Sequence, residues 1–137
     1  MAPETFRTQL KPVYTKMIER FKEVNPDIIP ILHCDGAVSE LLDDISEIGF
    51  EVFNPVQPGV PGHLPQDLKS RFGDKFAFWV AIDQQDLLPK GTDEELEKDI
   101  AEKISILGEG GGYMISPAHI IQNDVSPERV LKFIVLC

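Results

Sequence analysis

The sequence predicts an α/β fold in which a leading helix is followed by four strand–helix units. Two observations favour this class: helical and strand patterns alternate along the whole chain of 137 residues, and the segments that connect them are short. Connections of this kind imply a parallel sheet with right-handed crossovers. A mass of 15.3 kDa is that of one domain, so residues 1–137 are expected to form a single unit.

The leading helix is predicted over residues 6–24, where apolar residues recur at intervals of three and four. Pro12 lies inside this pattern and should kink or restart the helix. Asn25 and Pro26 should then end it, because this pair marks a turn. Residues 28–33 follow as a predicted buried strand.

The remaining elements continue the alternation. Strands are predicted over residues 50–53, 76–82 and 113–115, and helices over residues 38–48, around residues 68–72, over 93–107 and from residue 127 onward. The clearest strand is 76–82, because its apolar run is continuous, as in a strand covered on both faces. Thr92 and Glu95 form a capping box, which marks the start of the helix over 93–107.

Charge and cysteine content exclude several function classes. The chain has 13 Lys and Arg against 23 Asp and Glu, a formal net charge of −10. Binding to nucleic acid or to an anionic membrane surface needs clustered positive charge, so this balance argues against both. The apolar runs are far shorter than the ~20 residues that span a bilayer. Two cysteines, Cys34 and Cys137, form no disulfide framework, which favours the reducing cytoplasm.

Polar residues gather where the predicted strands end. In a parallel sheet the ligand site lies in the loops that follow the carboxyl ends of the strands. These loops hold His33, Cys34 and Asp35; Asn54, Gln57 and His63; Asp83, Gln84, Gln85 and Asp86; and His119, Gln122, Asn123 and Asp124. All three histidines of the chain are therefore expected on one face, which favours a functional site over solvated loops.

Each candidate also has a structural interpretation. His33 and Asp35 lie two residues apart on an extended segment, so both can reach one ligand while Cys34 points away. Without a metal the pair would make an orienting hydrogen bond, and two ligands fall short of the three or four that zinc takes. Asp83 could meet a cationic or N–H-bearing ligand or cap a loop, and His119 could donate a proton, bind a carboxylate or act as a cap.

Ordered motifs cover nearly the whole chain. They are His-Cys-Asp-Gly at 33–36, Gly-Phe-Glu-Val-Phe-Asn-Pro-Val-Gln at 49–57, Leu-Lys-Ser-Arg-Phe-Gly-Asp at 68–74, Ile-Asp-Gln-Gln at 82–85, Leu-Pro-Lys-Gly-Thr at 88–92, Gly-Gly-Gly-Tyr at 110–113 and Pro-Ala-His-Ile-Ile-Gln-Asn-Asp-Val-Ser-Pro-Glu at 117–128. Together they resemble the carboxyl-terminal half of the uroporphyrinogen decarboxylase (URO-D) superfamily, which includes cobalamin-dependent (corrinoid) methyltransferases. Members are single TIM barrels, so the resemblance implies half of a (β/α)8 barrel, with four parallel βα units preceded by a helix.

Two branches of the superfamily match different residues. Uroporphyrinogen decarboxylases read Gly-Asn-Leu-Asp-Pro where this chain has Val-Ala-Ile-Asp-Gln at 80–84. Asp83 then matches the aspartate that holds the pyrrole N–H groups of the tetrapyrrole, and His119 matches the histidine of a Gly-His-Gly segment. The Ala-Ile-Asp-Gln-Gln sequence at 81–85 is more similar to the methyltransferase branch. We therefore expect methyl transfer, with decarboxylation of uroporphyrinogen III in porphyrin biosynthesis, which needs no cofactor, as the alternative.

The first strand end departs from the methyltransferase pattern. That branch carries His-x-Cys-Gly, whose His and Cys bind a zinc ion that activates a thiol. Here Asp35 stands at the cysteine position, and residues 115–119 lack the second zinc cysteine of the branch, so the resemblance assigns no thiol-activating zinc. Sequences with Asp at this position look like demethylating members, which pass a methyl group from a methylated substrate to a corrinoid carried by a partner protein.

The resemblance implies a role for each candidate residue. His33 and Asp35 would polarise the substrate or hold a metal, and His119 would serve as an acid or an anion contact. Asp83 would orient the substrate or the corrinoid. The substrate-binding residues would be Asn54, Gln57, Gln84 and Gln85.

A third expectation is a half-barrel without catalysis of its own. Such a sheet exposes two edges and an inner face with residues such as Ile29, Ile31 and Trp79, and exposed edges invite pairing. Two copies of the chain, or a separate amino-terminal half-barrel, could close the barrel. The ends at Met1 and Cys137 are both expected to be truncations, because the first precedes a family helix and the second lies inside a helix.

Overall fold

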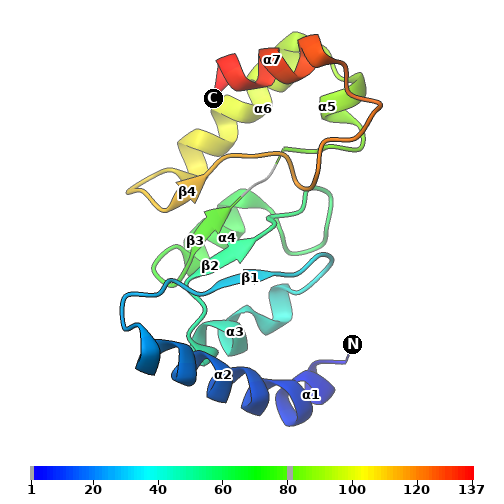
Figure 1. Ribbon diagram of the computed structural model, residues 1–137. Coiled ribbons are helices and arrows are strands. Elements are labelled where there is room, and N and C mark those ends of the chain that lie inside the picture. Colours follow the sequence, from blue (N-terminus) through cyan, green and yellow to red (C-terminus); the bar gives the residue numbers. More distant parts are fainter. Residues whose placement is uncertain (1, 80–81) are drawn as a thin grey trace.

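A four-stranded parallel sheet forms the centre of the chain. The structure, a computed structural model, describes residues 2–79 and 82–137. The strands are β1 (Ile31–His33), β2 (Val52–Asn54), β3 (Ala77–Trp79) and β4 (Tyr113–Met114). They lie side by side in the order β1-β2-β3-β4, and every neighbouring pair is parallel (Figure 1). This topology confirms the predicted α/β half-barrel.

Helices flank and connect these strands. They are α1 (Pro3–Thr5), α2 (Lys11–Val24), α3 (Leu42–Ile48), α4 (Pro65–Phe72), α5 (Leu87–Lys90), α6 (Asp93–Leu107) and α7 (Pro127–Leu136). The predicted capping box of Thr92 and Glu95 is present at the start of α6. The short helix α5 was not expected from the sequence. Within residues 2–79 and 82–137, no helix has the length and apolar character needed to cross a membrane.

Prolines set two of the element boundaries. Pro12 was expected to kink or restart the leading helix, but residues 3–24 form one continuous helical segment that is π-helical over residues 6–10. Pro12 has no N–H to continue the hydrogen-bond ladder, and the wider π-helical turn lies directly before it. The first strand begins at Ile31 rather than at residue 28, after the N–H-less Pro30.

The predicted strand over 76–82 is shorter in the structure. β3 ends at Trp79, and Val80 and Ala81 lie outside the described residues. Ile82 forms an isolated parallel bridge with Pro117. The contact between the third and fourth strand segments therefore extends beyond β4 toward the loop that carries His119.

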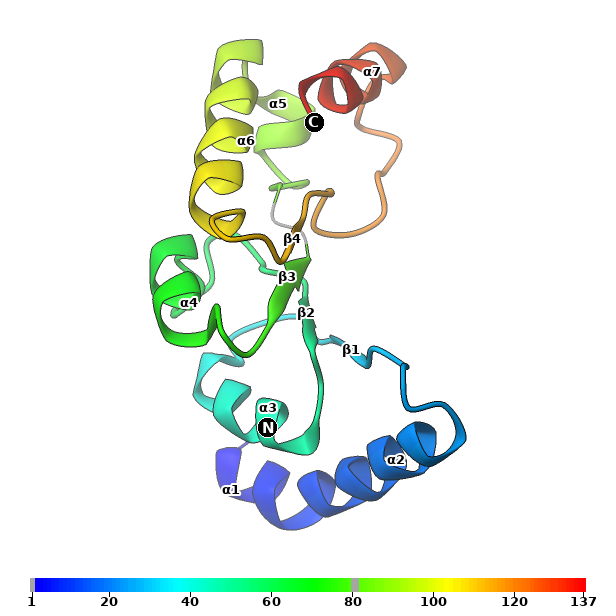
Figure 2. The same cartoon turned by 90° about the vertical axis from the view of Figure 1, so that its left-hand side faces the viewer.

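One face of the sheet is covered by helices. The register places Leu32, Phe53, Phe78 and Tyr113 side by side, and Phe53 and Phe78 are fully buried. This row packs against apolar residues of α3, α4 and the end of α6. Figure 2 shows the strands edge-on with α3, α4 and α6 on the same side. A second apolar cluster, centred on Ile82, joins α5, α6 and α7.

The opposite face, which would line the inside of a barrel, is more open. Its residues alternate with those of the covered row, so Ile31, His33 and Asn54 lie on it. Ile31 is 46% exposed on one edge strand and Met114 is 42% exposed on the other. Trp79, the register partner of Met114, is half-buried and donates from Nε1 to Ser116 Oγ at 3.1 Å. The predicted open inner face is therefore present.

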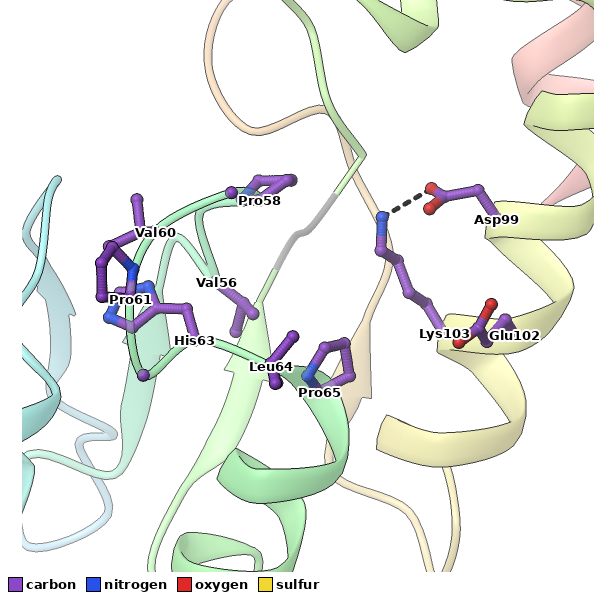
Figure 3. Close-up of a pocket in the computed structure, with 12 residues that line it drawn as sticks. Val56, Pro58, Val60, Pro61, His63, Leu64, Pro65, Asp99, Glu102 and Lys103 are labelled. Atoms are coloured by element: carbon purple, nitrogen blue, oxygen red, sulfur yellow. Dashed lines mark hydrogen bonds and ion pairs between the residues drawn. The ribbon is translucent and has the colours of Figure 1, made fainter.

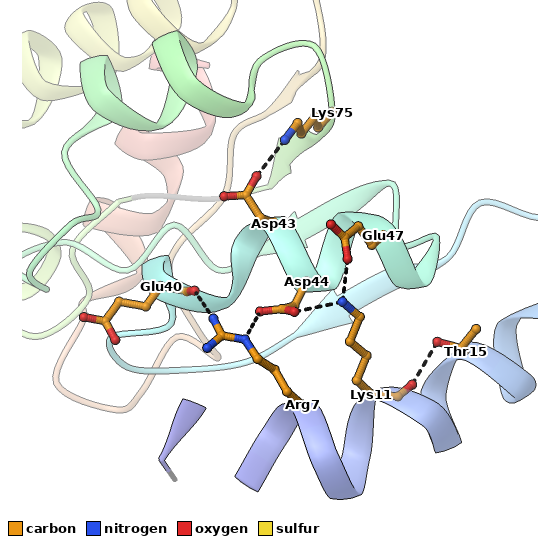
Figure 4. A network of polar contacts seen from close by, with 8 residues as sticks. All are labelled: Arg7, Lys11, Thr15, Glu40, Asp43, Asp44, Glu47 and Lys75. Carbon is orange, nitrogen blue, oxygen red and sulfur yellow. Dashed lines mark hydrogen bonds and ion pairs between the residues drawn. The ribbon is translucent and has the colours of Figure 1, made fainter. Parts of the chain in front are cut away.

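The amino-terminal helices are held on α3 by ion pairs as well as by apolar packing. Asp44 on α3 accepts a hydrogen bond from Arg7 Nε and another from Lys11 Nζ, both at 2.8 Å (Figure 4). Its side chain is only 11% exposed. The hydrogen bond from Lys11, helped by that from Arg7, holds the pKa of the Asp44 carboxyl below its ordinary value.

Candidate functional site

The end of β1 positions the first two candidate residues. The strand ladder continues one residue beyond His33, because the N–H of Cys34 donates to the carbonyl oxygen of Asn54 at 2.8 Å. Gly36 then adopts a φ of +87° and turns the chain away from the sheet. His33 and Asp35 point to the same side, with Nε2 and Oδ2 3.4 Å apart. The predicted alternation about Cys34 is confirmed.

A third residue joins this pair from the far end of the sheet. The loop after β4 is fixed by the hydrogen bond from Ala118 N–H to the carbonyl oxygen of Ile82, at 2.9 Å. This places the ring of His119 with its centroid 6.0 Å from that of His33. His33, Asp35 and His119 each offer one ligand atom, and the three atoms lie within 4.8 Å of one another. We call these three residues the His-Asp-His cluster; all are exposed on the open side of the sheet.

Asn54, the last residue of β2, and Gln57, in the loop that follows it, support the loop after β1. Asn54 Oδ1 lies 2.5 Å from His33 Nδ1, and Gln57 Oε1 accepts a hydrogen bond from the N–H of Gly36 at 2.8 Å. Both residues were expected to bind substrate. In the structure both contact the segment that carries the His-Asp-His cluster.

A small pocket of about 200 Å³ opens beside the cluster. Its lining comes from the loops after all four strands and consists of Asp35, Gln57, Pro58, Asp83, Gln84, Gln85, Ala118 and His119. Six of these had been predicted as site residues from the sequence, and the structure brings them around one cavity.

Asp83 and Gln84 have different roles in the walls of this pocket. Asp83 Oδ1 accepts a hydrogen bond from the N–H of Gln85 at 2.8 Å and lies 3.4 Å from the N–H of Asp86, so one carboxylate oxygen caps the loop. The Oε1 atom of Gln84 is buried and has no hydrogen-bond partner in the described part of the chain. An unpaired buried acceptor is costly, so a ligand with an N–H or O–H donor would stabilise it.

The histidine of the second loop does not belong to the site. His63 was expected on the same face as the other two histidines, but it is only 3% exposed and packs edge-on against Phe53 of the covered row, at 5.5 Å. Burial lowers the pKa of its imidazole. The expectation that all three histidines share one face is therefore wrong. His63 lies in the proline-rich loop over residues 58–65, and this loop places its ring against Phe53 on the covered face of the sheet.

Two further features lie apart from the cluster. Gln122, Asn123 and Asp124 line a separate hollow of their own. A larger cavity of about 480 Å³ lies between the 58–65 loop and α6, where Lys103 Nζ pairs with Asp99 at 2.5 Å (Figure 3). The sequence did not single out this partly buried ion pair, because its charges occur within an acidic helix that is otherwise solvated.

Cys34 offers no reactive thiolate. Its side chain is half-buried, and burial, together with the charge of Asp35, raises the pKa of the thiol.

The donor set of the His-Asp-His cluster fits a divalent transition metal. Imidazole nitrogen and carboxylate oxygen are zinc ligands, and catalytic zinc sites use three protein ligands while a fourth position stays open. Sequence spacing showed only the pair of His33 and Asp35 as ligands of one ion. The third ligand, His119, depends on the strand order, because a curved parallel sheet in the order β1-β2-β3-β4 brings the loop after β4 toward the loop after β1.

Comparison with known proteins defines the class. The family profile described as Uroporphyrinogen decarboxylase (URO-D) matches residues 1–137. The chain therefore belongs to the uroporphyrinogen decarboxylase (URO-D) family. No curated protein sequence matches it significantly.

A solved structure supports the same fold. The chain is similar to a methyltransferase from Methanosarcina mazei, with a TM-score of 0.76 and 19% sequence identity. The similarity covers 99% of this chain and 37% of the methyltransferase. The sheet and helices described above thus correspond to part of a larger fold.

Proposed function

We propose that this chain supplies the substrate-binding half of a corrinoid-dependent methyltransferase that removes a methyl group from a methylated small molecule. The observation that carries the proposal is the convergence of His33, Asp35 and His119 at the carboxyl ends of the strands. Ligand sites in parallel βα folds lie at this edge of the sheet. The similarity to a methyltransferase structure supports the choice of reaction.

Methyl transfer requires the site to stabilise the heteroatom from which the methyl group leaves. The bond between the methyl carbon and the substrate heteroatom breaks, its electron pair stays on the heteroatom, and the methyl group passes to the reduced corrinoid of a partner protein. A divalent cation held by His33, Asp35 and His119 would supply Lewis acidity to that heteroatom. Gln84 Oε1, the unpaired acceptor in the adjoining pocket, would orient a donor group on the substrate.

Metal binding tests the site without requiring turnover. Isothermal titration calorimetry with Zn²⁺ is expected to show one site per chain. His33→Ala and His119→Ala should each weaken binding by at least tenfold, because each removes one of three ligands. His63→Ala is the matched control, since His63 is buried away from the cluster and should not change the affinity. Binding that is equal in all four proteins would contradict the site.

Methyl transfer itself needs the completed barrel. With the chain joined to the segment that completes its sheet, we expect methylation of cob(I)alamin, followed by absorbance, from a member of a panel of methylated phenols, amines and thiols. The His33→Ala variant should lose this activity while retaining the fold by circular dichroism. If a folded, metal-loaded protein transfers a methyl group to cob(I)alamin from none of these compounds, the proposed reaction is contradicted.

A second candidate function is decarboxylation of a tetrapyrrole. It is favoured by Asp83 and Gln84, which put a carboxylate and an unpaired amide oxygen in one pocket, since both accept hydrogen bonds from pyrrole N–H groups. Fluorescence titration with uroporphyrin as the probe distinguishes the two functions. Tight binding that is lost in Asp83→Asn would favour decarboxylation, whereas its absence in a protein that binds Zn²⁺ would favour methyl transfer.

We also propose the kind of segment that closes the sheet. Helix α2 packs on α3 at one end of the sheet and α7 packs on α6 at the other, so both flanks already carry a helix. A closed eight-stranded barrel has one helix for each strand. If α1 is counted with α2 and α5 with α6, this chain supplies five of the eight helices, so the complement would have four strands and three helices.

A second copy of the chain fits this description poorly. Its α2 would compete with α7 of the first copy for one position in the ring of helices. Light scattering of the chain alone is expected to give the monomer mass of 15.3 kDa. Twice that mass, lost on substitution of both edge residues Ile31 and Met114 by lysine, would instead support closure by self-association.

A further inference from the structure

His33 has two polar neighbours that could orient its ring, and their distances differ. The Nδ1 atom lies 2.5 Å from Asn54 Oδ1, well within hydrogen-bond range. The Nε2 atom lies 3.4 Å from Asp35 Oδ2, which is longer than a good hydrogen bond between these groups. The sequence had favoured an orienting hydrogen bond between His33 and Asp35, and the geometry gives that role to Asn54.

We infer that Asn54 is a positioning residue that fixes the tautomer of His33, and that Gln57 holds the turn on which Asp35 lies. The inference rests on the proposed metal site, for which it supplies the supporting hydrogen bonds. Neither amide is then a direct ligand of the substrate, in contrast to the role expected from the sequence.

The chemistry of the amide determines which nitrogen carries the proton. An amide oxygen can only accept a hydrogen bond, so Nδ1 of a neutral His33 must carry the hydrogen. Nε2 then keeps its lone pair on the side of the ring that faces Asp35. This is the arrangement that a metal-binding histidine needs, with one nitrogen free for the ion and the other donating to a fixed acceptor.

The backbone explains why Asn54 can hold the ring in place. His33 and Asn54 are register partners in the pairing of β1 with β2. The carbonyl oxygen of Asn54 also accepts the N–H of Cys34 at 2.8 Å, so its main chain and its side chain both bind the end of β1. Three residues later, Gln57 Oε1 accepts the N–H of Gly36 at 2.8 Å. The segment that carries His33 and Asp35 is therefore held on both sides of Asp35.

The tautomer can be measured without any metal. In ¹⁵N NMR spectra of the metal-free chain above pH 8, His33 is expected to show a protonated Nδ1 and an unprotonated Nε2. Asn54→Val should move it toward the Nε2–H form that free histidine favours, and Asn54→Asp, which keeps an acceptor, should retain the Nδ1–H form. Asp35→Ala should leave the tautomer unchanged. Asn123→Val, a matched change at an exposed asparagine, checks that the substitution alone has no effect.

Zn²⁺ affinity provides the second measurement. Loss of an outer hydrogen-bond partner of a metal ligand weakens binding by about 10–100-fold, which is the effect expected of Asn54→Val. Asn54→Asp should restore most of the affinity. Gln57→Leu should weaken Zn²⁺ binding less than Asn54→Val does, because it removes the hydrogen bond to the turn at Gly36 and leaves the hydrogen bond to the His33 ring intact. Gln57→Glu, which keeps an acceptor for the Gly36 N–H, should restore the affinity.

The outcomes separate this inference from the proposed function. An Nδ1–H tautomer that depends on Asn54, in a chain that binds no Zn²⁺, would uphold the positioning role and contradict the metal site. Normal Zn²⁺ binding with a tautomer that Asn54→Val does not change would uphold the site and overturn the inference. A tautomer that changes in Asp35→Ala rather than in Asn54→Val would also overturn it.

Discussion

The two faces of the central sheet are built from alternate residues of the same strands, yet they differ in how deeply their side chains are buried and in the polar groups they carry. On the covered face, Phe53 and Phe78 are fully buried beneath helices. On the open face, Ile31 and Met114 remain 46% and 42% exposed, and the His-Asp-His cluster stands at its edge. The covered face therefore contains apolar core of the fold, whereas the open face leaves apolar and metal-ligating side chains accessible.

This difference separates stability from function. Substitutions on the covered face should unfold the chain without regard to ligands. Substitutions on the open face should change binding and association while leaving the fold intact.

The largest effect is expected for Phe53→Ala. Removal of a fully buried aromatic ring leaves a cavity and should lower the free energy of unfolding by about 3–5 kcal/mol, measured by urea denaturation. Ile31→Ala, on the open face of the edge strand, is the matched comparison and should cost about 1 kcal/mol or less. Equal losses in the two variants would show that the open face is packed after all.

A smaller effect is expected from the ion pairs that hold the amino-terminal helices on α3. Asp44→Asn should lower the free energy of unfolding by about 1–3 kcal/mol, because it removes a charged partner of both Arg7 and Lys11. Asp43→Asn is the comparison: Asp43 lies on the same helix but forms an exposed ion pair with Lys75, so its loss should lower the free energy of unfolding less than Asp44→Asn does.

The Asp44 contribution also has a defined pH dependence. The pKa of Asp44 lies below its ordinary value of 3.8 in the folded chain. Its stabilisation is therefore complete above that value and is lost as the pH falls through the lower, folded pKa. The free energy of unfolding, measured by urea denaturation at a series of acid pH values, should therefore decline as Asp44 becomes protonated. The Asp44→Asn variant should lack this part of the decline. A decline identical to that of the original chain would contradict the role of Asp44.

The smallest effect concerns the buried histidine of the covered side. The pKa of His63 lies below its ordinary value of 6.5, because burial disfavours the charged ring. The unfolded chain therefore takes up a proton at higher pH than the folded one, and stability should fall as the pH drops below 6.5. For one group the slope cannot exceed about 1.4 kcal/mol per pH unit. His63→Leu should flatten this segment of the stability profile, and an unchanged slope would show that other groups cause it.

The sequence predicted the covered side of the fold better than the site. Periodicity, caps and turns gave the alternation of helices and strands, because those signals are local. The position of His119 beside His33 and Asp35 depends on strand order and loop path, which no local pattern contains. The same limit explains His63, which the topology rule placed on the wrong face. The Asn54 contact to His33 depends on register, which periodicity alone does not define.

X-ray absorption at the zinc edge can show directly whether His33, Asp35 and His119 hold a metal at the open edge of the sheet. One equivalent of Zn²⁺ is added to the chain, and the spectrum is compared with those of the His33→Ala and His119→Ala variants. We expect two imidazole nitrogens and at least one oxygen around the ion, with one imidazole lost in each variant. A spectrum without imidazole, or one that neither substitution alters, would contradict it.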